Sequence, residues 1–117
     1  MSNDTEIRRS DVVIVRLDPA EGHEMRKTRS AVVVQNNIGN RNSNPTTVAL
    51  VTGTYRDYPF EALMEASDSP FEKDSSVRLD QIRVVSVEKR IHSVASNLED
   101  STMGEIDDAL KLSLGLD

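Results

Sequence analysis

Arg29 and Thr52 are the residues of this sequence whose types and positions could act together on a phosphate. Arg29 precedes the apolar run at 31–34, and Thr52 closes a second apolar run at 46–52. If both runs are antiparallel strands joined by the polar loop at 36–45, their outer ends lie side by side. An arginine fork can hold two phosphate oxygens and stabilise charge that develops on them. A hydroxyl can donate a hydrogen bond to a phosphate oxygen or orient a ribose hydroxyl. An exposed ion pair and an ordinary strand-end threonine fit the same spacing, and spacing alone favours that plainer alternative.

A charged loop leads into Arg29. The segment 22–42 holds four basic residues and a single acid, namely Arg26, Lys27, Arg29, Arg41 and Glu24. The whole chain has a net charge of −6: residues 1–60 carry eight Lys/Arg against seven Asp/Glu, and residues 61–117 carry six against thirteen. That balance argues against a simple basic nucleic-acid binder. A local positive patch on an acidic body can still attract phosphate, and Glu24 could add a carboxylate beside it.

Several kinds of site are excluded or lack support. Cysteine is absent, which excludes disulfides and every cysteine-based mechanism. His23 and His92 have no ligand-like spacing, and the sequence has neither a nucleophile elbow nor a glycine-rich phosphate loop. We therefore expect no metal and no cofactor. The polar first residues lack a signal-peptide core, and no apolar run reaches membrane-spanning length, so we expect a cytoplasmic protein without a membrane partner.

The hydrophobic pattern predicts five strands. Short β-branched or alternating runs bounded by Pro, Gly, Asn and Ser are typical of strands. They lie at 11–17, 29–35, 46–52, 60–66 and 75–87, the last of them long and bent. The Asn- and Gly-rich segment 36–45 is predicted as a turn-forming loop, and 88–91 as one helical turn.

A change of period after residue 97 predicts a C-terminal amphipathic helix at about 101–114. Its apolar positions at helical spacing are Met103, Ile106, Leu110 and Leu114. Thr102 with Glu105 fits a capping box, and Gly115 fits a helix stop.

The chain is long enough for one domain, 1–117, with residues 1–9 as a flexible lead-in. Five strands followed by a helix predict a mainly β fold with helices (α+β), built as a small curled sheet or barrel with the helix packed on it. The last helix carries more leucines than so small a domain uses for its own core, so we expect a symmetric homodimer.

A series of short segments, in this order, resembles the MazF/PemK family of toxins. No segment is specific by itself, but the ordered set extends from about residue 8 to residue 116. The segments are SDV at 10–12, LDP at 17–19, GHE at 22–24, RSAVVVQN at 29–36, Thr52, YPFE at 58–61, DSSV at 74–77, DQIR at 80–83 and ALKLSLGL at 109–116.

The resemblance implies a small, partly open, SH3-like β-barrel with a C-terminal helix, working as a homodimer. It implies an endoribonuclease that needs no metal and no ribosome and cuts single-stranded mRNA at short specific sequences. In such toxins the 2′-hydroxyl attacks the adjacent phosphate and leaves a cyclic phosphate and a 5′-hydroxyl. The family's key arginine and threonine fall on Arg29 and Thr52, and Glu24 falls near the active site. The implied partner is a cognate antitoxin whose disordered tail fills the RNA groove.

The resemblance also implies a set of RNA contacts around these residues. They are His23, Arg26, Lys27, Gln35, Asn36, Asn37, Arg41 and Gln81. This sequence departs from the family pattern at three positions. The family usually has glycine where Ser10 stands and proline where Ser30 stands, and relatives with a Gln-Asn-Asp run have aspartate where Asn37 stands.

Two other functions fit the same sequence. One is a binding protein of the toxin fold, either directed at gyrase or able to sequester an antitoxin, and the other is a structural dimer without catalysis. Arg29, Thr52 and the GHE loop favour the nuclease, because gyrase-directed relatives lack that set. RNA cleavage in the presence of EDTA would separate the three.

Overall fold

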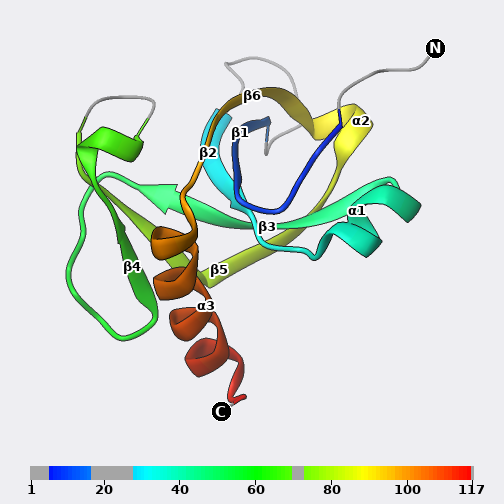
Figure 1. Ribbon diagram of the computed structural model, residues 1–117. Coiled ribbons are helices and arrows are strands. Elements are labelled where there is room, and N and C mark those ends of the chain that lie inside the picture. The colour runs from blue at the N-terminus through cyan, green and yellow to red at the C-terminus, as the bar shows by residue number, and fades with distance from the viewer. Residues whose placement is uncertain (1–5, 17–27, 70–72, 117) are drawn as a thin grey trace.

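Six antiparallel strands form one sheet in the order β4-β5-β3-β2-β1-β6, and helix α3 packs on it (Figure 1). This computed structural model describes residues 6–16, 28–69 and 73–116. The strands are β1 (Asp11–Arg16), β2 (Thr28–Val33), β3 (Pro45–Thr52), β4 (Glu61–Met64), β5 (Ser75–Ser86) and β6 (Ile91–Asn97). The helices are α1 (Asn37–Asn42), α2 (Val87–Arg90) and α3 (Asp100–Leu114), with one 3-10 turn at Ala66–Asp68. The predicted fold class is confirmed: the sheet curls without closing, and β4 and β6 are its two edges.

Two apolar clusters lie on opposite faces of this sheet, because successive side chains of a strand alternate between faces. The helix-side cluster is Val12, Val32, Val34, Ala49, Val51, Ala62, Met64, Val77, Leu79, Leu98, Met103, Ile106 and Ala109. The barrel-side cluster is Ile7, Val13, Val15, Ala31, Val33, Val48, Leu50 and Val85. Strands β1, β2 and β3 contribute to both clusters, which explains why their sequences are continuous apolar runs.

Helix α3 covers the helix-side cluster through Met103, Ile106 and Ala109, with Leu110 partly buried against it. The predicted helical spacing is therefore confirmed for Met103, Ile106 and Leu110, whereas Leu114 is 55% exposed. Gly115 ends the helix in the left-handed conformation as expected. The predicted capping box is wrong. Glu99 is the N-cap and makes no side-chain capping bond, so Thr102 lies within the first helical turn.

The predicted loop at 36–45 contains helix α1. Asn36 caps it, because its side-chain oxygen accepts the Gly39 N–H at 2.8 Å. Asn40 ties the helix to the sheet by donating to the Gln35 carbonyl at 3.0 Å and accepting from the Thr46 hydroxyl at 2.6 Å. Side-chain hydrogen bonds, rather than an apolar face, thus stabilise this short helix, and none of its residues is buried.

Strand β6 was not predicted. It pairs with β1 alone, with two irregularities in the register, and most of its side chains are exposed. A strand with little buried surface has no reason to show the alternation that marks a half-buried strand. The helical turn expected at 88–91 is confirmed as α2, shifted by one residue.

Ser10 sits at the entry to β1 with φ of 85°, a conformation that costs a residue with a side chain but suits glycine. Its hydroxyl accepts a hydrogen bond from Asn97 at 2.9 Å, but Asn97 also bonds Asp11 at the same distance. We expect Ser10→Gly to raise the free energy of unfolding by about 0.5–1 kcal/mol, because relief of strain exceeds the loss of one exposed bond. Ser10→Ala should lower it, because the bond is lost and the strain stays. Urea unfolding of both variants measures the two signs, and a stabilised alanine variant would contradict this account.

Candidate active site

Strands β2 and β3 bring Arg29 and Thr52 to the same end of the sheet. Their ladder pairs Ala31 with Leu50, and the same register continued by two residues aligns Arg29 with Thr52. Both side chains then belong to the face of the barrel-side cluster, at its outer limit. Arg29 is exposed and Thr52 is half-buried. A permanent cation and a hydroxyl are thus available to solvent where the apolar surface ends.

Four of the predicted site residues precede this point in the chain. His23, Glu24, Arg26 and Lys27 lie outside the described residues, so their predicted roles stay predictions.

A hollow of about 390 Å³ opens beside Thr52. Its lining consists of Ser30, Val51, Thr52, Gly53, Lys73 and Ser75. Ser30 and Val51 follow the register that aligns Arg29 with Thr52, but their side chains belong to the opposite, helix-side face. The hollow and the Arg29 side chain therefore lie at the same end of β2 and β3 but on opposite faces of the sheet.

Next to Thr52 along the sheet lies a buried carboxylate that sequence reasoning missed. Thr52 pairs with Ser76 on β5, and the Ser76 hydroxyl donates to Glu61 at 2.9 Å. The Glu61 side chain has no exposed surface. It also accepts from the backbone N–H and the Nε of Arg56, both at 3.0 Å, and from the Arg56 Nη2 at 2.5 Å. Burial alone would raise the pKa of the Glu61 carboxyl, but the hydrogen bonds from Arg56 and Ser76 hold the pKa below its ordinary value.

Arg78 joins the same network from β5. It pairs with Glu61 across the β4–β5 ladder, and its Nε lies 3.6 Å from the Glu61 carboxylate. Its guanidinium also donates two hydrogen bonds to Asp80, at 2.9 and 2.7 Å. These bonds lower the pKa of the Asp80 carboxyl and raise the pKa of Arg78. Two cations and two carboxylates therefore lie together in a network that extends from the partner of Thr52.

Arg56 also covers an aromatic surface. Its guanidinium carbon lies 4.7 Å from the centre of the Tyr58 ring, which in turn lies 5.4 Å from the Phe60 ring. Tyr58 is one of the exposed large apolar side chains. A signal for this network was present in the sequence, because alternation along β5 puts Ser76, Arg78 and Asp80 on one face. Their meeting with Glu61 depends on the β4–β5 register, which the sequence does not show.

The predicted amide contacts lie at the other end of β2, around α1. Gln35 donates to Asn40 at 2.9 Å, Asn36 caps α1, and Asn37 accepts the backbone N–H of Arg9 at 2.7 Å. The structure thus separates these three amides from Arg29 by the length of the strand and engages each in an internal hydrogen bond. Gln81 is exposed on β5 beside the register shift with β3.

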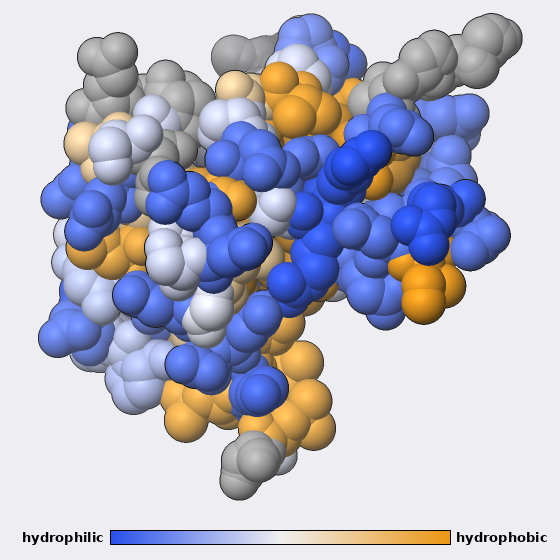
Figure 2. Space-filling model, in the orientation of Figure 1, coloured by the Kyte–Doolittle hydropathy of each residue, from blue (hydrophilic) through white to orange (hydrophobic). Residues whose placement is uncertain are grey.

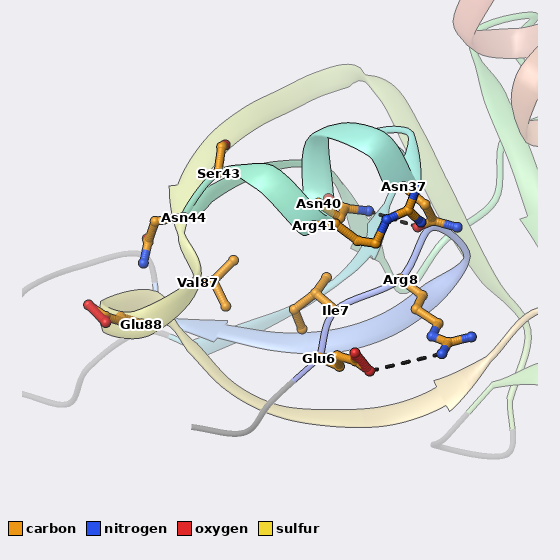
Figure 3. Close-up of a pocket in the computed structure, with 10 residues that line it drawn as sticks. All are labelled: Glu6, Ile7, Arg8, Asn37, Asn40, Arg41, Ser43, Asn44, Val87 and Glu88. Atoms are coloured by element: carbon orange, nitrogen blue, oxygen red, sulfur yellow. Dashed lines mark hydrogen bonds and ion pairs between the residues drawn. The ribbon is translucent and has the colours of Figure 1, made fainter. Parts of the chain in front are cut away.

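Arg41 lines a second hollow of about 620 Å³ at this far end, between the first described residues, α1 and α2 (Figure 3). Its floor includes Ile7 and Val87, and its rim carries basic, acidic and amide side chains. In Figure 3 the only interaction of an arginine at this rim with an acid is the weak pair of Arg8 with Glu6 at 3.9 Å. The mixture of charges gives this hollow no clear preference for an anion.

Within residues 6–16, 28–69 and 73–116, no group of three or more His, Asp or Glu side chains is placed to hold a metal ion. None of the helices in those ranges is long and apolar enough to cross a membrane.

Residues 8–114 match the model of a family described as PemK-like, MazF-like toxin of type II toxin–antitoxin system. Among solved structures, the chain is similar to an endoribonuclease in complex with its cognate antitoxin from a mycobacterial species. They share 25% identity over 95% of this chain and 97% of that one, with a TM-score of 0.78. A second mycobacterial endoribonuclease shares 26% identity over 96% and 94% of the two chains, with a TM-score of 0.76. The MazE–MazF complex from Deinococcus radiodurans has the same fold, at 23% identity, 97% and 100% coverage and a TM-score of 0.79. The match over nearly the whole chain, on the fold described above, means that this protein belongs to the PemK-like, MazF-like toxin family of type II toxin–antitoxin systems.

Proposed function

We propose that this protein is an endoribonuclease toxin that cuts single-stranded mRNA at short specific sequences without a metal ion. The observation that carries the proposal is the antiparallel β2–β3 ladder, whose register, continued two residues past the Ala31–Leu50 pair, aligns Arg29 with Thr52. An arginine and a hydroxyl side by side suit a phosphodiester, whose charge grows in the transition state. The names of the two mycobacterial relatives support the same reaction class.

In the proposed reaction the 2′-oxygen of one nucleotide attacks the adjacent phosphorus and the bond to the 5′-oxygen breaks. The 2′-hydroxyl loses its proton, the leaving 5′-oxygen gains one, and the products are a 2′,3′-cyclic phosphate and a 5′-hydroxyl. Arg29 donates to the non-bridging oxygens, where it stabilises the developing charge. Thr52 donates one neutral hydrogen bond that orients the same group. Glu24 is the proposed carboxylate for the proton of the 2′-hydroxyl.

The test is incubation with a long single-stranded RNA in the presence of EDTA, followed by mapping of the cut ends. Cleavage that persists in EDTA and leaves cyclic-phosphate ends is the expected result. Intact RNA, together with tight binding of an antitoxin, would instead identify a binding protein of the toxin fold. A cognate antitoxin is the proposed protein partner, in line with the antitoxin complexes formed by the similar structures.

We also propose that the active form is a homodimer. Apolar surface gathers around the C-terminal end of α3 (Figure 2), where Leu112, Leu114 and Leu116 are each more than half exposed. Val84 on β5 is 71% exposed. An apolar surface of this kind typically marks an interface.

Sedimentation at micromolar concentration should give a dimer for the parent protein. Leu114→Glu should shift it to monomer, because a carboxylate in the interface loses its hydration without gaining a partner. Ile38→Glu is the matched control, since Ile38 is another exposed apolar residue, on α1, and this variant should remain dimeric. A parent protein that sediments only as a monomer would refute the proposal.

A further inference from the structure

The hollow beside Thr52 has a lining suited to an anion. Its lining includes the polar residues Ser30, Thr52, Ser75 and Lys73, and the Ser75 hydroxyl donates to the Lys73 carbonyl at 3.5 Å. Among residues 6–16, 28–69 and 73–116, no acidic side chain contributes to the lining. Among the described acids, Asp74 is adjacent to Lys73 in sequence, but its carboxylate accepts the backbone N–H of Ala66 at 2.8 Å. The described lining therefore combines one positive charge with neutral polar groups.

These donors are available. Among residues 6–16, 28–69 and 73–116, neither the Ser30 hydroxyl, the Thr52 hydroxyl nor the Lys73 ammonium has a hydrogen-bond or ion-pair partner. Ser30 is nevertheless only 8% exposed, so its hydroxyl opens on the hollow rather than on bulk solvent. The Lys73 ammonium lies 4.0 Å from the point that a Cβ would occupy at Gly53, which places the charge over the end of β3.

The position of the hollow relative to Arg29 identifies the anion. Arg29 and Ser30 are consecutive in β2, so their side chains leave opposite faces of the strand. Thr52 lies at the junction, aligned with Arg29 by register and in contact with the hollow. A polymer with regularly spaced phosphates can therefore place one phosphate at Arg29 and the next one in the hollow.

We propose that Ser30 and Lys73, beside Thr52, form a second phosphate subsite, which binds the RNA phosphate next to the one that is cut. This inference rests on the proposed function. Ser30 stands where the family usually has proline, which has no hydroxyl, so this contact is a feature of the present sequence. The subsite holds the RNA backbone and leaves the chemistry to Arg29.

Binding of a mixed-sequence RNA that is fully 2′-O-methylated tests the subsite without cleavage, because such RNA lacks the attacking hydroxyl. Lys73→Met should weaken binding and reduce the slope of log affinity against log salt by about 0.7, the value for one phosphate on a single strand. Ser30→Ala should weaken binding at an unchanged slope, because it removes a neutral donor. Lys89→Met, a change of another exposed lysine on α2, is the control and should alter neither quantity.

A second arm uses cleavable RNA with one neutral methylphosphonate on either side of the mapped cut. One of the two methylphosphonate substitutions should weaken RNA binding by the parent protein. The same substitution should not weaken RNA binding by Lys73→Met any further. Equal salt slopes for the parent and Lys73→Met would overturn the subsite and leave the proposed cleavage standing. If the parent cuts no RNA but Lys73→Met still lowers the slope, the cleavage proposal is overturned and the anion site stands.

Discussion

Replacing Arg29 with alanine is expected to slow RNA cleavage by about two to three orders of magnitude, the usual loss for one preorganised charge-stabilising donor. Arg29→Lys should be almost as slow, because lysine keeps the charge but lacks the planar fork that holds two oxygens. Thr52→Ala should lose less, because it removes a single neutral hydrogen bond. Single-turnover cleavage at saturating RNA measures all three rates.

The same variants must remain folded for these rates to have meaning. Arg29 is exposed and Thr52 only half-buried, so neither substitution removes a core contact. Thermal melting should therefore change little, and the variants should dimerise as the parent does. An Arg29→Ala protein that is folded and cuts at the parent rate would mean that the active site lies elsewhere.

The antiparallel pairing of the two strands that carry Arg29 and Thr52 could be predicted because it needs little more than two apolar runs and a short connection. Antiparallel neighbours joined by a short segment align their outer ends whatever the segment's structure. The predicted strand pairing was therefore correct although the segment 36–45, predicted as a loop, contains helix α1. Helix α1 was missed because its stability comes from Asn36, Asn40 and Gln35 side chains, and such residues are equally typical of turns.

Hydrophobic periodicity predicted the strands that have buried faces and missed the one that does not. Strands β1, β2 and β3 supply both apolar clusters, whereas β6 is an edge strand with exposed side chains. The charged network around Glu61 escaped prediction for a different reason. Its members come from a loop and two strands, and only the β4–β5 register brings Glu61 opposite Arg78.

That network leads to the largest expected effect on stability. Glu61→Ala should lower the free energy of unfolding by about 3 kcal/mol, at the lower end of the range for breaking a buried ion pair. The value is at the lower end because the Arg56 side chain is 43% exposed and can regain water. Glu61→Gln should lose less, because the amide oxygen can still accept from Ser76 and from the Arg56 N–H. Urea unfolding at pH 7 measures both losses, and Glu65→Gln, at an exposed neighbour just after β4, should change little.

The pH dependence separates loss of charge from loss of shape. The pKa of the Glu61 carboxyl is lower in the folded protein than its ordinary value, so the ionised form stabilises the fold. This contribution is fully present above the unfolded pKa, about 4.3 for glutamate, and is lost as pH falls through the folded pKa. The difference in unfolding free energy between the parent and Glu61→Gln should therefore be constant near neutral pH and shrink below about pH 4. A difference that stays the same down to pH 3 would show that the carboxylate charge does not stabilise the fold, and that Glu61 acts through packing and neutral hydrogen bonds alone.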